Sequence, residues 1–191
     1  MAGSTKLYYD AGQFEFVAQL ETHWQTIRQE LEHLGDGDFI AWPEKYLYGQ
    51  GWDIFGLYAF GIKVGANCKL CPETTRLIEQ IPGLVSAGFS SLKPGTHIAP
   101  HTGYPDGLLR CHLGLIVPDG SALRVGEAVR SWREGCCLVF DDTTEHEAWN
   151  QGSFTRIVLL LDFKAPAGLL SVPVKPESKG LAALFGLLKK K

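Results

Sequence analysis

Leu-Arg-Cys-His-Leu-Gly-Leu-Ile-Val, residues 109–117, decides the fold because polar and apolar side chains alternate along it. Alternate residues of a strand point to opposite faces of the sheet. Arg110 and His112 therefore share one face with Ile116. The other face is apolar and consists of Leu109, Cys111, Leu113, Leu115 and Val117. If that face packs in a core, Arg110 and His112 point into the mouth of a barrel, where ligands of such folds bind; the plainer interpretation is a polar face in solvent.

Further runs with β-strand character surround this one, separated by Pro, Gly, Asp or Asn. They cover residues 84–92, 122–125, 136–140 and 154–163. Several short strands joined by turns favour an antiparallel barrel or double-sheet jelly roll over a βαβ fold. We predict a mainly β fold, a double-stranded β-helix of the jelly-roll or cupin-like kind with flanking N-terminal helices.

The N-terminal part has a different pattern. Apolar residues at spacings of three and four predict an amphipathic helix over residues 14–34, closed by Gly35. Aromatic residues and glycines over residues 42–64 suit short strands and tight turns, and residues 73–81 suit a short helix. We predict a single domain over residues 1–166, with a helical and aromatic part at 1–83, a β core at 84–166 and a tail at 167–191.

The composition limits the function. The chain has 191 residues, 45% of them hydrophobic, and a net charge of -3, which excludes a general nucleic-acid binder. No apolar run approaches the roughly 20 residues of a transmembrane helix, and the first six residues lack a signal core. Five cysteines are an odd number and suggest a reducing compartment, so the expected location is the cytoplasm. The basic tail suits a docked or mobile helix, or peripheral contact with a membrane or partner.

Two further residues carry chemistry. His146 follows a carboxylate-rich turn, and neutral imidazole is a good ligand for iron and zinc. Arg156 stands in a nearly continuous apolar run, where a buried guanidinium needs an anionic partner. That partner is either an internal carboxylate or a bound dicarboxylate.

From about residue 24 to residue 163, the chain resembles the aspartyl/asparaginyl β-hydroxylase family of Fe(II)- and 2-oxoglutarate-dependent oxygenases. The resemblance rests on the order of several short segments. They are Phe89-Ser90, Lys93-Pro94-Gly95-Thr96-His97, Pro100-His101-Thr102-Gly103, Leu109-Arg110-Cys111-His112-Leu113-Gly114-Leu115, Trp132-Arg133-Glu134-Gly135, Phe140-Asp141-Asp142, His146-Glu147-Ala148-Trp149 and the strand around Arg156. Together these segments are a strong signal, whereas each alone is weak.

The resemblance implies a role for each matching residue. His101 and His146 would bind Fe(II). Arg156 would pair with the distal carboxylate of 2-oxoglutarate, since a guanidinium fork suits a carboxylate, with help from the Ser90 hydroxyl. His112 would support this cosubstrate. Arg110 would then be free to hold the substrate through an anionic group.

Gly103 stands where many such iron sites have a carboxylate ligand, two residues after the first histidine. The family resemblance implies that this is normal for these hydroxylases, since positions on the metal remain for water and dioxygen. Asp142 would accept a hydrogen bond from that water without binding the metal itself.

The implied reaction is hydroxylation of a C–H bond by O2, with release of succinate and CO2. The expected substrate is the β-carbon of an Asp or Asn residue or a related anionic group; a lipid acyl chain or a small molecule is the alternative. Three rivals remain. The position beside Gly103 could admit chloride and make a halogenase, the histidines with Cys68 and Cys71 could bind zinc, or the chain could be a cupin-like carboxylate-binding module without activity.

Overall fold

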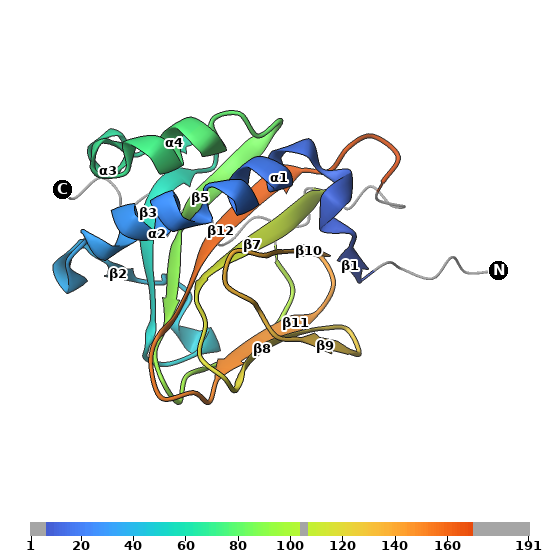
Figure 1. The fold of residues 1–191 in the computed structure, drawn as a ribbon. Coiled ribbons are helices and arrows are strands. Elements are labelled where there is room, and N and C mark those ends of the chain that lie inside the picture. Colours follow the sequence, from blue (N-terminus) through green and yellow to red (C-terminus); the bar gives the residue numbers. More distant parts are fainter. Residues whose placement is uncertain (1–6, 104–106, 170–191) are drawn as a thin grey trace.

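In the computed structural model, which describes residues 7–103 and 107–169, two antiparallel sheets face each other and helices cover the outer face of the larger one (Figure 1). In spatial order, the larger sheet contains β1 (Tyr8–Tyr9), β10 (Cys137–Asp141), β7 (Leu108–Ile116), β12 (Arg156–Lys164), β5 (Leu84–Leu92), β3 (Trp52–Ala59) and β2 (Ile40–Ala41), with β4 (Ile62–Lys63) paired to β3. The smaller sheet contains β6 (His97–His101), β11 (His146–Asn150), β8 (Ser121–Val125) and β9 (Ala128–Arg130). The predicted mainly β, jelly-roll fold is confirmed.

Four α-helices cover the larger sheet: α1 (Glu15–Thr22), α2 (Trp24–Glu32), α3 (Gly65–Leu70) and α4 (Pro72–Ile78). Three 3-10 turns complete the described elements, at Ala11–Gln13, Asp36–Asp38 and Lys45–Leu47. One apolar core lies between these helices and the larger sheet, and it contains Leu109, Cys111, Leu113 and Leu115. The apolar face predicted for residues 109–117 therefore packs in this core as far as Leu115, whereas Ile116 packs against it in place of Val117, which contacts the other core.

A second core lies between the two sheets. Its buried members include Trp52, Leu92, Phe140 and Leu160 from the larger sheet and Leu123 from the smaller one. The Tyr8 hydroxyl bridges the two sheets by donating to the Leu123 carbonyl at 2.8 Å. This interior holds the polar face of β7.

The predicted helix over residues 14–34 is two helices, because the chain breaks at His23, where φ is -102° and ψ is 13°. Side chains compete with the helical backbone at the break: the Thr22 hydroxyl donates to the Ala18 carbonyl, and the His23 Nδ1 pairs with the Gln19 carbonyl. The N-terminal part is also less separate than predicted, since β1, β2 and β3 belong to the larger sheet.

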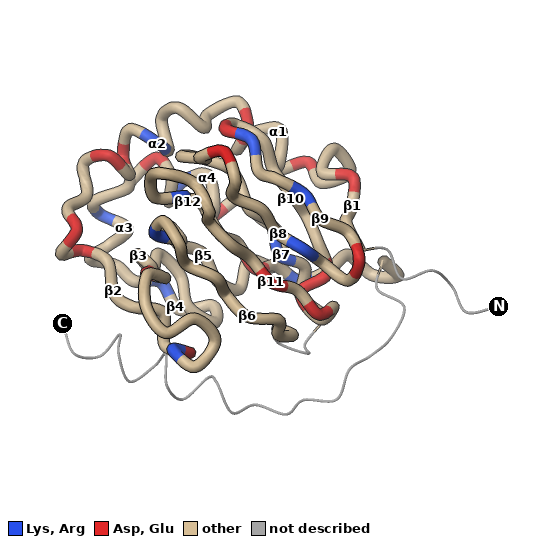
Figure 2. Tube along the Cα trace, turned by 90° about the horizontal axis from the view of Figure 1, so that it is seen from below, with Lys and Arg blue, Asp and Glu red and all other residues tan. Residues whose placement is uncertain are grey.

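The strands β6 and β11 were not predicted, although they carry both candidate iron ligands. The predicted tail lies outside the described residues from residue 170 onward. Along the described trace, acidic and basic positions are interspersed rather than gathered in a basic tract (Figure 2). No described helix combines the length and the apolarity that crossing a bilayer requires.

Candidate metal and carboxylate site

The candidate residues converge on one pocket between the two sheets. The pocket is lined by Trp52, Ser90, Ile98, His101, Arg110, His112, Leu123, Phe140, His146, Ala148, Arg156 and Leu160. Both sheets contribute to it, so no single stretch of sequence contains it. The structure thus brings together six of the seven predicted site residues as lining residues, and the seventh, Asp142, is completely buried within 3.4 Å of His146.

His101 and His146 are direct cross-strand partners in the pairing of β6 with β11, and their ring centroids lie 4.3 Å apart. A β-bulge in β6 makes this arrangement possible. His146 pairs with His101 and Ala148 with Ile98, so three steps along β6 match two along β11. The extra residue reverses the alternation, which lets Ile98 and His101 both face the pocket while His97 faces outward.

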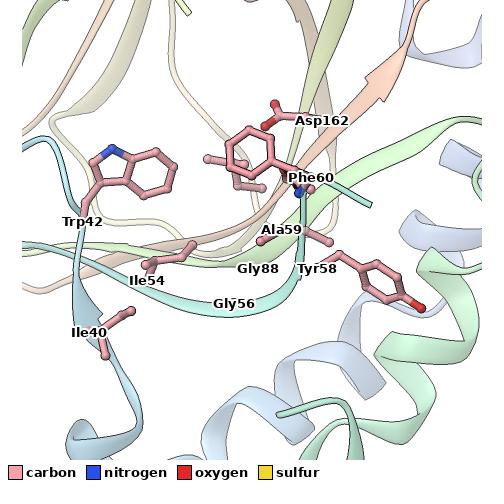
Figure 3. Close-up of a pocket in the computed structure, with 12 residues that line it drawn as sticks. Ile40, Trp42, Ile54, Gly56, Tyr58, Ala59, Phe60, Gly88 and Asp162 are labelled. Atoms are coloured by element: carbon pink, nitrogen blue, oxygen red, sulfur yellow. Dashed lines mark hydrogen bonds between the residues drawn. The ribbon is translucent and has the colours of Figure 1, made fainter. Parts of the chain in front are cut away.

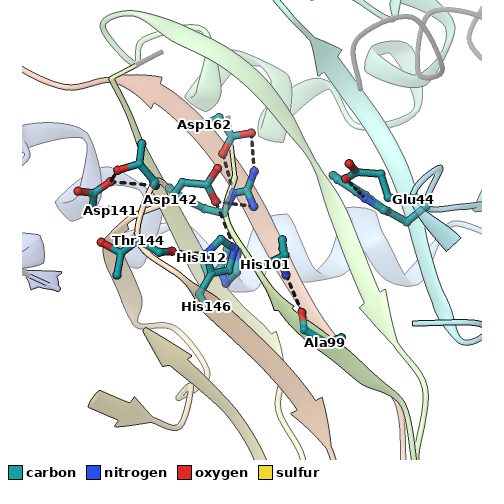
Figure 4. Close-up of polar contacts among 12 residues, drawn as sticks. Glu44, Ala99, His101, His112, Asp141, Asp142, Thr144, His146 and Asp162 are labelled. Carbon is teal, nitrogen blue, oxygen red and sulfur yellow. Dashed lines mark hydrogen bonds and ion pairs between the residues drawn. The ribbon is translucent and has the colours of Figure 1, made fainter. Parts of the chain in front are cut away.

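Hydrogen bonds set the orientation of both rings. The His101 Nδ1 lies 2.8 Å from the Ala99 carbonyl and the His146 Nδ1 lies 2.8 Å from the Thr144 carbonyl (Figure 4). A carbonyl only accepts, so each Nδ1 carries the proton and each Nε2 presents a lone pair. Burial, followed by the neighbouring His101 and Arg110, lowers the pKa of His146 to about 3. His146 is therefore a neutral imidazole whose buried Nε2 has no hydrogen-bond partner among the described residues.

The space beside Gly103 contains the Asp142 carboxylate. A Cβ atom added to Gly103 would lie 1.6 Å from the Asp142 Oδ2, and the Gly103 N–H donates to the Asp142 backbone carbonyl at 2.7 Å. The Asp142 carboxylate, which follows β10, thus occupies the space where a side chain of residue 103 would lie. The Asp142 Oδ1 lies 3.4 Å from the His146 Nε2, and two acceptors that face each other suit a cation or a polarised water between them.

His112 presents a donor to the same pocket. The Trp132 Nε1 donates to the His112 Nδ1 at 3.3 Å, so the ring proton is on Nε2. This Nε2 is buried without an acceptor among the described residues. Burial, and then Arg110, Arg156 and His146, hold the pKa of His112 well below its usual value. His112 is therefore a neutral donor that lines the pocket.

Arg156 is the largest fully buried side chain described, with 1% of its surface exposed. Its Nη1 donates to the Ser90 carbonyl at 3.3 Å, its guanidinium lies 4.6 Å from the centre of the Trp132 ring, and its Nε has no partner among the described residues. Burial lowers its pKa to about 9. The internal salt bridge considered for Arg156 is not found in the described part of the chain, so a bound anion as its counter-charge stays a prediction.

Ser90 lies beside Arg156 with its hydroxyl oriented. The Trp52 Nε1 donates to the Ser90 Oγ at 3.0 Å, so the hydroxyl proton remains to be donated. Ser90, His112 and Arg156 thus form a cluster of hydrogen-bond donors on the larger sheet. His146 on the smaller sheet presents a lone pair instead. One pocket therefore offers ligands for a cation and donors for an anion.

Arg110 is not free, and that part of the prediction is wrong. Its Nε and Nη2 donate to the two Asp162 oxygens at 2.7 and 3.1 Å, and its Nη1 lies 2.7 Å from the Asp142 Oδ1. The cause is strand register, which places Asp162 of β12 directly opposite Arg110 of β7. Burial raises the pKa of Asp162, and the Arg110 ion pair opposes that rise. A substrate contact by Arg110 stays a prediction, and it requires exchange with one of these carboxylates.

Three residues around the site were missed or assigned to packing in the sequence: Trp52, Trp132 and Asp162. Asp162 had a signal, since it is an acidic residue six positions after Arg156 in the same apolar run. The indole N–H groups of Trp52 and Trp132 had none, because a donor's partner depends on tertiary packing.

The cysteines do not join the histidines. Cys68 and Cys71 are buried in the core on the helix side of the larger sheet, the Cys68 thiol donates to the Leu57 carbonyl, and burial raises the pKa of Cys71 to about 12. Within residues 7–103 and 107–169, no three His, Cys, Asp or Glu side chains form a metal-binding group. Structural zinc takes four protein ligands, so the zinc alternative loses its ligand set there.

Comparison with known proteins identifies the family. Residues 21–166 match the family model described as aspartyl/asparaginyl beta-hydroxylase. The chain is 42% identical over 169 residues to an ornithine lipid ester-linked acyl 2-hydroxylase of Rhizobium tropici, covering 83% of this chain and 60% of the relative. It is 34% identical over 166 residues to the human aspartyl/asparaginyl beta-hydroxylase, covering 82% of this chain and 22% of that protein.

The chain therefore spans less than two thirds of the length of either relative. Among solved structures, a cupin-2 domain of Rhodospirillum rubrum overlaps with 81% of this chain and 84% of that chain, at 13% identity and a TM-score of 0.46.

Proposed function

Because the chain belongs to the aspartyl/asparaginyl β-hydroxylase family, we propose that it is an Fe(II)- and 2-oxoglutarate-dependent dioxygenase that hydroxylates a C–H bond. One observation carries the proposal. The same buried pocket contains a neutral imidazole whose lone pair has no described donor, and ring N–H and guanidinium donors that have no described acceptor. A metal cation and a carboxylate together satisfy both sets.

The residues fit the two groups. His101 and His146 would hold Fe(II) through Nε2, with each Nδ1 proton kept on a backbone carbonyl. Arg156, Ser90 and His112 would hold 2-oxoglutarate by its carboxylates. Bound iron supplies the oxidation of 2-oxoglutarate by O2 to succinate and CO2, and with it the oxidising power for the C–H bond.

The protein's own contribution is to orient the bound groups and to limit the water that enters the pocket. Asp142 is completely buried between Arg110 and His146, so its carboxylate can hold a water beside the metal. The Asp142 carboxylate also argues against the halogenase alternative, because chloride beside Gly103 would lie against a like charge.

The pocket must adapt to its cosubstrate. Its cavity volume is about 20 Å³, which is too small for a five-carbon dicarboxylate without side-chain movement. Trp52 and Trp132 both contact the residues proposed to bind it. We expect 2-oxoglutarate to change the tryptophan fluorescence as it binds.

The test follows succinate formation and Fe(II) binding in the full chain. His101→Ala and His146→Ala should abolish succinate formation and weaken Fe(II) binding at least 100-fold, because each removes a proposed ligand. His97→Ala is the matched control: His97 is on the same strand, faces outward and pairs with Glu147, so its loss should leave both activities near wild type. Full succinate formation by His146→Ala would refute the metal assignment.

A binding module without activity is the non-enzyme rival. It would bind 2-oxoglutarate but form no succinate in the presence of Fe(II), O2 and a reductant. The names of the relatives give two kinds of substrate, an aspartyl or asparaginyl residue and a lipid acyl chain. We propose one of these for this chain, with Arg110 exchanging one of its carboxylates for an anionic group of the substrate.

A further inference from the structure

A second cavity lies on the same face of the larger sheet as the proposed iron site. Its walls include Ile40, Trp42, Ile54, Gly56, Phe60 and Gly88, and its volume is about 50 Å³, so it too must widen to take a chain of many carbons. Leu160 lines both cavities, and Gly88 of the second cavity is two residues from Ser90 of the first along β5. The second cavity thus continues the first along the sheet, toward β2.

A pair of glycines shapes this part of the sheet: Gly56 leaves open space, whereas a Cβ atom added to Gly88 would lie 2.6 Å from the Phe55 carbonyl oxygen. Gly56 of β3 and Gly88 of β5 are cross-strand partners, so neither strand carries a side chain at this level of the sheet. A Cβ atom added to Gly56 would find no atom within 4 Å, which means that it would point into open space. Figure 3 shows the Trp42 indole and the Phe60 ring on the same side of the β3 ribbon that carries Gly56. The result is a narrow trench with aromatic rings at its sides.

The polar side chains that line the trench have partners of their own. The Trp42 Nε1 donates to Glu44, the Tyr58 hydroxyl donates to Glu79, and the Ser86 Oγ accepts from the Phe60 N–H. Asp162 is paired with Arg110. A peptide in this trench would therefore leave its backbone groups without partners, which is costly, whereas an alkyl chain needs none.

Phe60 has a strained backbone at the rim of the trench. Its φ is +50°, and it is the single non-glycine residue with a positive φ in the described part of the chain. It precedes Gly61 in the turn between β3 and β4, where positive φ at both positions favours Asn-Gly. A bulky residue is unfavourable at this backbone conformation, so the turn itself does not account for the Phe60 ring.

We propose that this trench binds the alkyl chain of an acyl substrate and places a carbon near its polar end beside His101 and His146. The placement of the reacting carbon rests on the proposed function, whereas binding of the chain does not. Of the two kinds of substrate open above, the trench selects the acyl chain, because its walls are mostly apolar and its Trp42 N–H and Tyr58 hydroxyl already donate to Glu44 and Glu79.

The test measures binding of straight-chain fatty acids from six to fourteen carbons to the full chain without metal, by displacement of cis-parinaric acid. For wild type, affinity should rise roughly fourfold per methylene until the trench is full and then level off. Gly56→Val and Gly56→Phe fill the trench without a steric clash at Cβ, so they should level off at shorter chains and weaken the longest ones at least tenfold. Gly65→Val is the matched control, because Gly65 also has open space at its Cβ but begins α3 on the helix side of the sheet.

Phe60→Asn separates binding from folding. Asn tolerates the positive φ, so the melting temperature should hold or rise, while affinity for long chains falls. Wild-type affinities that do not depend on chain length would overturn the proposal. So would unchanged long-chain affinity in Gly56→Phe, or preferential binding of peptides over fatty acids.

The two proposals can fail separately. If the chain binds fatty acids in this length-dependent way and forms no succinate, the trench assignment stands and the oxygenase proposal falls. If succinate forms and Gly56→Phe leaves the fatty acid series unchanged, the oxygenase proposal stands and the trench assignment falls.

Discussion

Arg156 is a buried positive charge that the fold alone does not explain. It is fully buried on β12, it has no carboxylate partner in the described residues, and burial lowers its pKa to about 9. A buried charge without a counter-ion destabilises the folded protein, so it persists where binding requires it. The same logic applies to the His112 N–H and to the His146 lone pair.

Arg156→Met should therefore have opposite effects on stability and on binding. We expect the free energy of unfolding to rise by about 1–3 kcal/mol, because methionine has a similar reach and no charge to bury. Affinity for 2-oxoglutarate should fall at least 100-fold. Chemical denaturation and fluorescence titration measure the two effects, and a variant that is less stable and still binds 2-oxoglutarate tightly would contradict this role.

Gly103 lies against the Asp142 carboxylate, so a side chain at this position would displace Asp142. Gly103→Ala should destabilise the protein by about 1–3 kcal/mol and weaken Fe(II) binding, because its Cβ would overlap the Asp142 carboxylate. Gly103→Asp should do at least the same, so it does not by itself identify His101 as a ligand.

A double-mutant cycle separates steric overlap from other causes. In Gly103→Ala with Asp142→Gly, the overlap is gone, so the two destabilising effects should combine to less than their sum by at least 1 kcal/mol. Additive effects in denaturant unfolding would mean that Gly103 and Asp142 act independently.

Among the elements, β6 and β11 show how short strands build the site. The bulge in β6 turns His101 inward and His97 outward, although an even spacing would place them on the same face. On the larger sheet, the regular strands β7 and β12 set Arg110 against Asp162 by register alone. The proposed iron ligands and the proposed carboxylate donors thus come from different sheets.

The helical layer has its own stabilising contact at the start of α4. The Glu30 carboxylate on α2 accepts from the Glu73 N–H, the Thr74 N–H and the Thr74 hydroxyl, at 2.6–2.8 Å. It therefore caps α4 from another helix, where a negative charge is favoured. Glu30→Ala should lower the free energy of unfolding by about 1–3 kcal/mol and leave succinate formation per folded molecule unchanged.

Thermal unfolding and turnover assays check this prediction together. Glu32→Ala is the control, because Glu32 is an exposed α2 residue whose described partner is Arg28 in a surface salt bridge. An equal loss of stability in both variants would show that the cap is not responsible.

At the scale of the whole molecule, the two facing sheets bury the ionisable groups of the site, and this makes stability depend on pH. The pKa of His146 is about 3 in the folded protein, below its usual 6.5, and that of His112 is shifted in the same direction. The unfolded chain therefore takes up protons that the folded chain does not. The part of the stability that depends on these two histidines is fully present above pH 6.5 and is lost as the pH falls toward 3.

For His146 alone, the metal-free protein should lose about 2 kcal/mol of unfolding free energy between pH 7 and pH 5. His146→Leu should remove that part of the loss, because leucine does not titrate. Denaturant unfolding at the two pH values in the presence of a chelator measures the difference. A pH dependence that is the same in wild type and His146→Leu would contradict the buried neutral imidazole.

Much of the fold follows from local pattern. The strand at residues 84–92 was predicted with its observed bounds, and the two faces of β7 were assigned correctly up to Leu115, because strand alternation is a local property. Ile116 was assigned to the wrong face, because a register shift against β12 reverses the alternation there. β6 and β11 were missed because they are short and rich in polar residues, with Pro100 in one of them. The break at His23 was missed because an apolar period continues across it.

The sequence by itself determined the mainly β class, the apolar and polar faces of the central strands and the family, because these depend on residue types and their spacing. The tertiary structure alone decided that Asp142 fills the space beside Gly103, that Arg110 is paired with Asp162, and that a glycine pair opens a trench beside the site. These contacts join residues far apart in the chain. They depend on strand register and on one bulge, which no local pattern specifies.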